Sequence, residues 1–167
     1  MKRRGLVRRE IRGNPFFKEW VPDPYRAQGK PRAPARCPNC GVQFRAGRWR
    51  WAETAPRGLR AVDCPACRRI EAHDPAGELV LSGRFLSEHR DEILATVKHV
   101  ESLESREHPL NRIMSIDERD GDMLICTTDI HLPHRIGHAI RNAWGGSTRT
   151  HYDLEGYFTR VRWTRDD

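Results

Sequence analysis

The chain has 167 residues, of which 37% are hydrophobic and 32% charged, and its formal net charge is +7. This is enough for one ordinary domain or two small ones. No run approaches the roughly 18 to 20 apolar residues of a membrane span, and the charged N-terminal segment lacks the apolar stretch of a secretory signal. We therefore expect a cytoplasmic protein with no membrane partner. In the reducing cytoplasm, paired cysteines indicate metal binding or catalysis in preference to disulfide bonds.

Positive charge is concentrated at the start of the chain. Residues 1–60 hold 16 Lys or Arg and 4 Asp or Glu, a net charge of +12, whereas residues 61–167 hold 14 and 19, a net charge of −5. Residues 1–36 are rich in Pro and Arg and their Pro-rich part lacks apolar periodicity, so we expect an extended, partly disordered basic arm. A concentrated positive field favours nucleic acid phosphates, because binding releases their counterions.

Two matched cysteine pairs follow the arm. Cys37-x2-Cys40 and Cys64-x2-Cys67 are separated by 23 residues, and each pair can point two sulfurs at one ion from a tight turn. A tetrahedral sulfur cage suits one Zn2+, and four thiolates leave no open coordination site, so the ion is expected to be structural. The spacing predicts a zinc ribbon over residues 37–73. A rubredoxin-type iron centre and a redox pair are the alternatives.

The segment between the cysteine pairs alternates basic and aromatic residues. In "FRAGRWRWAE" Trp49 and Trp51 fall on one side of a predicted strand, and Arg48 and Arg50 fall on the other. We interpret this segment as a surface that contacts phosphates and unstacked bases. The residues assigned to it are Arg45, Arg48, Arg50, Arg57, Arg60, Trp49 and Trp51. Alternatively, the tryptophans are the core of the small ribbon.

Residues 80–167 are predicted to form an α+β domain. After a turn at residues 73–79, apolar side chains recur every three or four positions over about residues 84–106, which predicts an amphipathic helix. A strand hairpin, a second helix and a final strand follow. The resulting order of helix, strand, strand, helix and strand gives a small α+β layer with two helices on one face.

The hairpin has the clearest turn signal in the chain. Asp120 and Gly121 suit a two-residue turn with positive φ. Counting back from this turn, Met114 should lie opposite Thr127. The register places one apolar set on a common face: Met114, Ile116, Met123 and Ile125.

The second helix and the final strand also carry boundary signals. Thr128 or Asp129 can cap the helix, and Gly145 ends it. Residues 151–163 alternate as a single strand, with a shift of phase near Gly156 that predicts a β-bulge.

Three histidines lie at helical spacing in "HLPHRIGH": His131, His134 and His138. A hydrolytic zinc helix has Glu directly after the first His, but Arg135 stands in that place, and its charge opposes metal binding. We therefore interpret the histidines as part of a polar helix face. No nucleophile elbow, phosphate loop or dinucleotide-binding motif stands out, so we expect no enzymatic activity.

Two stretches carry a resemblance to a known family, "DPYRAQGKPRAPARCPNCG…GRWRW…CPAC" and "GRFLSEHRDEIL…EHPLNRI". The family is one of uncharacterised bacterial zinc-ribbon proteins, and the resemblance covers most of the sequence. The cysteine pattern more distantly resembles the N-terminal zinc region of the export adaptor for the large ribosomal subunit in eukaryotes and its archaeal relatives, which carries more cysteine pairs. The resemblance implies metal ligation by Cys37, Cys40, Cys64 and Cys67, and it suggests association with ribosomes.

Together these features predict a non-enzymatic, RNA-binding zinc-ribbon protein that associates with ribosomes or rRNA. A DNA-binding or transcription-associated ribbon explains the charge equally well, although no recognition helix stands in the basic part. A protein adaptor that docks through the ribbon or the α+β domain is a further alternative. A metal enzyme built on the three histidines is the last.

Overall fold

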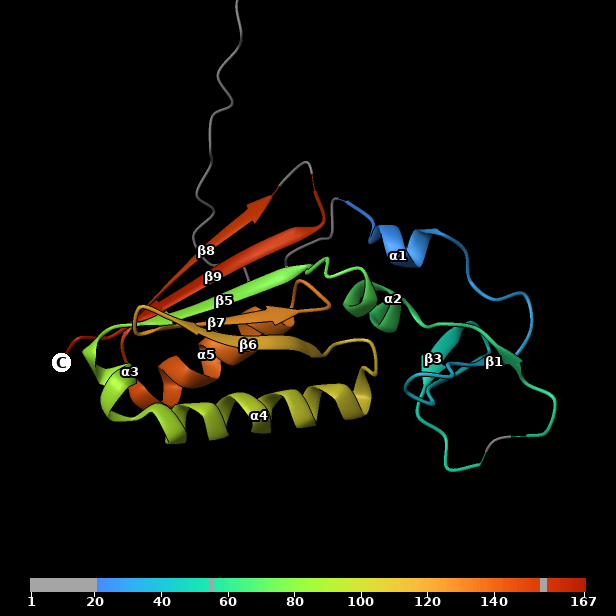
Figure 1. Cartoon of the computed structure of the whole chain (residues 1–167), viewed down its shortest axis with the longest axis horizontal. Helices are drawn as coiled ribbons and strands as arrows, with labels where there is room; N and C mark the ends of the chain where they lie inside the picture. Colours follow the sequence, from blue (N-terminus) through green and yellow to red (C-terminus); the bar gives the residue numbers. More distant parts are fainter. Residues whose placement is uncertain (1–20, 55, 154–155) are drawn as a thin grey trace, which may run out of the picture.

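The computed structural model describes residues 21–54, 56–153 and 156–167, so the first 20 residues of the predicted arm lie outside it. Within the described residues the chain is mixed α/β, with two sheets and five helices. A small sheet lies near the four cysteines, and a larger sheet carries three of the helices (Figure 1). None of the helices in the described ranges combines the length and hydrophobicity needed to cross a bilayer.

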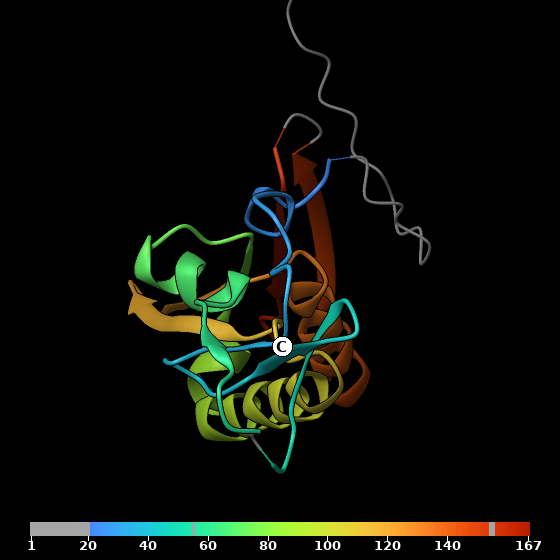
Figure 2. The same cartoon turned by 90° about the vertical axis from the view of Figure 1, so that its right-hand side faces the viewer.

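We call residues 35–71 the cysteine module; Figure 2 views the molecule from the end that carries it. Its elements are β1 (Ala35–Arg36), β2 (Gln43–Arg45), β3 (Arg48–Arg50), β4 (Arg60–Ala61) and α2 (Pro65–Glu71). The sheet order is β3-β2-β1-β4, with β1 antiparallel to β2 and parallel to β4. Ala46 and Gly47 both adopt positive φ, 47° and 78°, as the two-residue turn between β2 and β3 requires.

Residues 21–36 belong to the predicted extended arm, but the structure anchors this stretch on the module. Its short helix α1 (Pro24–Ala27) begins at Asp23, whose carboxylate accepts a hydrogen bond from the backbone N–H of Tyr25 at 3.0 Å. Asp23 is buried and pairs with Arg69 of α2 at 2.7 Å. The Arg69 guanidinium also lies 4.2 Å from the centre of the Tyr25 ring. This contact joins partners 46 residues apart, which local composition does not reveal.

We call residues 77–164 the body. Its elements are β5 (Gly77–Ser82), α3 (Arg84–Glu88), α4 (Arg90–Glu107), β6 (Ile113–Arg119), β7 (Asp122–Thr127), α5 (Leu132–Trp144), β8 (Ser147–Asp153) and β9 (Phe158–Thr164). The strand order is β6-β7-β5-β9-β8, with β5 antiparallel to β7 and parallel to β9. Helices α3, α4 and α5 cover one face of this sheet (Figure 1), as the sequence predicts for its two long helices.

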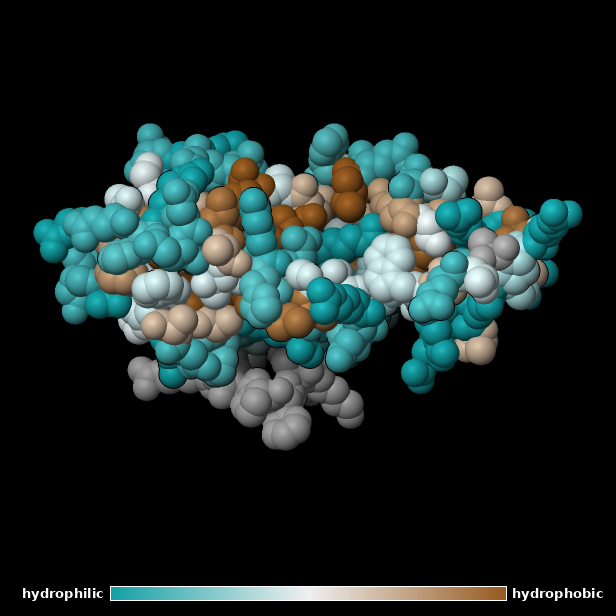
Figure 3. All heavy atoms as spheres, turned by 90° about the horizontal axis from the view of Figure 1, so that it is seen from below, coloured by the Kyte–Doolittle hydropathy of each residue, from teal (hydrophilic) through white to brown (hydrophobic). Residues whose placement is uncertain are grey.

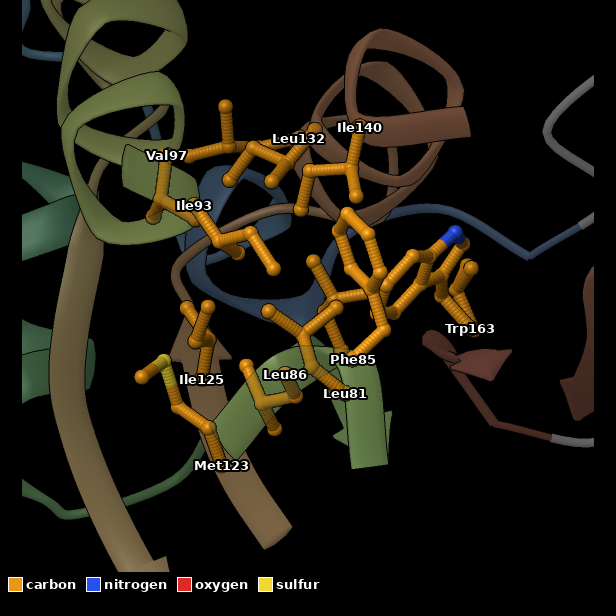
Figure 4. Packing of buried hydrophobic residues seen from close by; sticks show 13 residues of the cluster. Leu81, Phe85, Leu86, Ile93, Val97, Met123, Ile125, Leu132, Ile140 and Trp163 are labelled. Carbon is orange, nitrogen blue, oxygen red and sulfur yellow. The ribbon is translucent and has the colours of Figure 1, made fainter. Parts of the chain in front are cut away.

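The core of the body lies between the sheet and these helices (Figure 4). Alternate residues of β5, β7 and β9 point toward it, and the helices contribute residues three or four positions apart. Each large aliphatic side chain buried in this way stabilises the fold by about 1.5 to 3 kcal/mol. The side chains with the least exposure include Leu79, Leu81, Ile93, Val97, Met123, Ile125, Leu132, Ile136, Ile140 and Trp163.

The predicted helix over 84–106 is two helices that meet at His89. Its φ of −122° interrupts the helical path between α3 and α4. The imidazole stacks on Phe85, with ring centroids 4.1 Å apart, and lies 5.8 Å from the Trp144 ring. This aromatic contact keeps His89 on the apolar side of the helix pair.

Two segments of the body have a different secondary structure from the one predicted. Residues 77–82, which overlap the predicted turn, form β5, the central strand of the sheet. The predicted single C-terminal strand is a hairpin of β8 and β9, because the chain reverses near Gly156 instead of bulging. The backbone N–H of Phe158 donates to the Gly156 carbonyl at 3.0 Å. The sheet therefore has five strands where three were expected.

The hairpin of β6 and β7 forms around the predicted turn, and Ile116 lies opposite Ile125 as expected. Further along, a β-bulge shifts β6 by one residue, so that Ile113 and not Met114 lies opposite Thr127. Ile113 packs against the core in consequence.

Helix α5 begins close to the predicted cap. The Asp129 carboxylate accepts hydrogen bonds from the backbone N–H groups of His131, at 2.8 Å, and Leu132, at 3.2 Å. Burial raises the pKa of this carboxyl, although both hydrogen bonds oppose the shift. Gly145, with a φ of 70°, ends the helix as predicted.

Candidate metal centre

The four predicted ligands come together in one cluster. The Sγ atoms of Cys37, Cys40, Cys64 and Cys67 all lie within 4.8 Å of one another, and no disulfide joins them. The Sγ atoms of Cys40 and Cys64 are 3.7 Å apart, whereas two sulfurs bound tetrahedrally at about 2.3 Å from one Zn2+ stand about 3.8 Å apart. The cluster can therefore hold one metal ion with four sulfur ligands.

Both cysteine pairs stand in tight backbone turns, and two N–H groups of the second pair point at sulfurs. In the first pair, Gly41 adopts a φ of 81°, and its N–H donates to the Cys37 carbonyl at 2.9 Å. In the second pair, Cys64 immediately precedes α2, and its Sγ accepts a hydrogen bond from the Cys67 N–H at 3.4 Å. The Cys64 N–H donates to the Cys37 Sγ at 3.4 Å and so links the pairs. Such donors stabilise thiolate charge.

The centre lies where the cysteine module meets the body. Val42 and Ala66 of the module are buried beside the sulfurs, and Trp49 packs against them from β3. Leu110, in the connection between α4 and β6, packs on the same cluster from the side of the body. These contacts make the metal centre part of the interface between the two parts.

An arginine of the body reaches the sulfurs. Arg112, which directly precedes β6, donates to the Sγ atoms of Cys40 at 3.2 Å, Cys67 at 3.6 Å and Cys64 at 3.7 Å. Its Nε donates to the Pro109 carbonyl at 2.6 Å, which holds the guanidinium in place. Because four thiolates around a divalent ion leave two negative charges, Arg112 can neutralise one of them.

The thiols of the cluster differ in acidity. A hydrogen bond with Cys64 lowers the pKa of Cys40 to about 4 against the effect of burial, and Arg112 adds to this shift. The same hydrogen bond is the largest cause that raises the pKa of Cys64, and burial is the second largest. Burial is the largest cause that raises the pKa of Cys67, to about 11. Metal binding by all four thiolates therefore releases protons.

A groove of about 1160 Å³ lies beside the centre, between the cysteine module and the body. One wall includes β3, and the other includes the end of α4 and the start of α5. Cations outnumber carboxylates along it, so the groove is positive. The cations are Arg26, Lys30, Arg48, Arg50, Arg68, Arg106 and Arg135, and the carboxylates are Asp63, Glu104 and Glu107.

One of these carboxylates is already neutralised. Glu104 is buried, pairs with Arg135 at 2.9 Å and accepts a hydrogen bond from Asn111 at 2.9 Å. This pair removes one carboxylate and one cation, Arg135, from the balance, so the net positive charge of the groove comes from the remaining cations.

The arginines predicted to contact nucleic acid separate into two groups. Arg48 and Arg50 line the groove, whereas Arg45, Arg57 and Arg60 do not. Within the described part of the chain, none of the five forms an ion pair with a carboxylate. Arg45 and Arg48 face each other across the β2–β3 ladder. Seen from the side of α4, the end that carries the module is mostly hydrophilic (Figure 3).

The two tryptophans between the cysteine pairs lie in different surroundings. Trp49 lies edge-on against Phe44, with ring centroids 5.4 Å apart, and packs on the cysteine cluster, as the core interpretation expects. Trp51 is 45% exposed and lines the groove. Its indole N–H donates to the Ser105 carbonyl of α4 at 2.7 Å, and Arg112 lies 5.6 Å from its ring centre.

The three histidines of α5 and its start do not form a ligand group. Among the described residues, the four cysteines are the only set of three or more potential ligands close enough to share an ion. His134 stacks on Tyr152 and hydrogen-bonds its hydroxyl, and burial lowers the pKa of His134. The ring of His138 contacts Asn142 at 3.1 Å.

Comparison of the chain with protein-family models, with curated proteins and with solved structures finds no match. The fold and the site define a mixed α/β protein with a four-cysteine centre and an adjoining basic groove. Arg112 and the body wall of the groove escape sequence reasoning, because Arg112 stands 45 and 72 residues from Cys67 and Cys40. A lone arginine before a strand carries no local signal of that contact.

Proposed function

We propose that the chain is a non-enzymatic RNA-binding protein that acts on ribosomes or rRNA and holds one structural zinc ion. The observation that carries the proposal is the set of exposed arginines on the cysteine module that pair with no carboxylate among the described residues: Arg48, Arg50, Arg57 and Arg60. Guanidinium groups left unpaired are available to phosphate, which they bind bidentately.

Zinc suits the donor set of the cysteine cluster. Four thiolates close the coordination sphere and leave no position for water or substrate, so the ion stabilises the fold and takes no part in catalysis. Among the described residues, the buried hydrophobic cluster around the sulfurs is small: besides the cysteines it holds Val42 and Ala66, with Trp49 and Leu110 packed against it. Metal binding, worth about 10 to 16 kcal/mol in small zinc modules, would therefore dominate the stability of the cysteine module.

Ribosome association is supported by two features of the chain. The first is the net charge of +12 over residues 1–60, which favours a large polyanion. The second is the resemblance of the cysteine pattern to the zinc region of the ribosomal export adaptors. Sedimentation of cell lysate at low and high salt, with and without ribonuclease, tests the association. We expect the protein to travel with ribosomes at low salt and to leave them at high salt or after ribonuclease treatment.

RNA binding itself is tested with the purified protein. We expect the dissociation constant for RNA to rise steeply with salt, and the slope to shrink by about 2 when Arg48, Arg50 and Arg57 are replaced together by Ala, since each contact to single-stranded RNA contributes about 0.7. The matched control removes three exposed arginines of the body: Arg119, Arg149 and Arg162. Equal binding by the parent and the first variant would contradict the proposal.

The competing functions give different outcomes in the same experiments. A DNA-binding ribbon would prefer duplex DNA to structured RNA in direct competition. A protein adaptor would keep its partners in pull-downs after nuclease treatment. Either result would replace RNA binding as the function.

A further inference from the structure

The groove beside the metal centre has the features of a single-strand site. We propose that it binds a single-stranded stretch of the RNA, with a base stacked on Trp51 and phosphates held from both walls. This inference rests on the proposed RNA-binding function and adds the form of RNA and the place where it lies. With a volume of about 1160 Å³, the groove has room for a short stretch of single strand.

Trp51 is held in position before any ligand arrives. It is one of the two large hydrophobic side chains that stay exposed among the described residues, at 45%. Its N–H is bound to the Ser105 carbonyl, and Arg112 lies 5.6 Å from its ring centre. An exposed indole fixed in this way loses little conformational entropy when a base stacks on it. Stacking requires an unpaired base, because a duplex keeps its bases stacked on each other.

Cations stand on both sides of this aromatic platform. Arg48 and Arg50 come from β3, and Arg106 comes from the last turn of α4. Lys30, from the segment that precedes β1, completes the set. These four are exposed and form no ion pair within the described ranges. Cations on opposite walls of a concave surface suit a flexible backbone that enters it.

The test compares binding of a short unstructured RNA with binding of an RNA duplex of equal length, with zinc-loaded protein. Trp51→Leu removes the platform, and we expect it to weaken single-strand binding by about 10-fold or more while duplex binding changes little. Trp51→Phe keeps an aromatic ring and should bind more tightly than the Leu variant. Zinc content and circular dichroism of each variant confirm that the fold is retained.

A second pair of variants tests the walls. Replacing Lys30 and Arg106 together by Ala removes two charges from the groove, and replacing Arg57 and Arg60 removes two charges outside it. We expect the first variant to lose more affinity for the single strand than the second. Equal losses, parental binding by Trp51→Leu, or preference for the duplex would each overturn the groove assignment and leave RNA binding standing. Failure to bind any RNA would overturn the proposed function instead.

Discussion

Arg112 offers the sharpest test of the metal centre, because it belongs to the body and yet contacts three of the four sulfurs. Its shortest contact, 3.2 Å to the Cys40 Sγ, is a charge-assisted hydrogen bond worth about 1.5 to 3 kcal/mol, and the contacts to Cys67 and Cys64 are longer. We therefore expect Arg112→Ala to weaken zinc binding by about 2 kcal/mol, or roughly 30-fold. Losses of 10- to 100-fold are typical when a partner of the metal ligands is removed.

Competition with a chromogenic chelator measures the zinc affinity of Arg112→Ala directly. Arg112→Lys should fall between the parent and the Ala variant, since an ammonium keeps the charge but lacks the planar fork. Arg119→Ala, in the exposed end of β6, is the control and should bind zinc as the parent does. If Arg112→Ala kept the parental affinity with its fold intact, the reasoning that the body neutralises the sulfur cluster would be refuted.

Three further predictions concern the stability of the fold, measured by urea unfolding of the zinc-loaded protein. Asp129→Ala removes the carboxylate that accepts the N–H groups of His131 and Leu132 at the start of α5 and should cost about 1 to 2 kcal/mol, whereas Asp129→Asn keeps an acceptor and should cost less; equal costs would show that these hydrogen bonds are not the cause. Arg69→Ala removes the closer of two cationic partners of the buried Asp23 carboxylate and leaves it Arg26 at 3.5 Å, so the cost should lie at the lower end of about 3 to 5 kcal/mol. A change below 1 kcal/mol would contradict the buried pair. Because burial lowers the pKa of His134 from 6.5, the unfolded chain takes up a proton at a higher pH than the folded chain, so stability should fall as the pH drops below about 6.5. His134→Gln should reduce this dependence, and an unchanged profile would rule out His134 as its source.

Features that depend on residues close together in the sequence were predictable. The spacing of Cys37, Cys40, Cys64 and Cys67 indicated a shared ion, and the structure brings the four sulfurs within reach of one. The turn at 120–121 and the end of α5 at Gly145 were likewise readable, whereas α5 begins after His131, two residues beyond the predicted cap.

Features that depend on distant partners were not predictable. The six residues of β5 alternate too briefly to stand out beside Pro75 and Gly77, yet β5 becomes the central strand because β7 and β9 supply its hydrogen bonds. The body wall of the groove has the same origin, since Arg106 faces the module only after the chain has folded. Asp23 and Arg69 illustrate the point within the arm, since they form a buried ion pair that composition alone does not indicate.

The most direct test of the account is the metal content and coordination of the purified protein. X-ray absorption at the zinc edge, combined with native mass spectrometry, should show one zinc ion per chain with four sulfur neighbours at about 2.3 Å. A chain without metal, an ion with nitrogen or oxygen ligands, or disulfides within the cluster would contradict it.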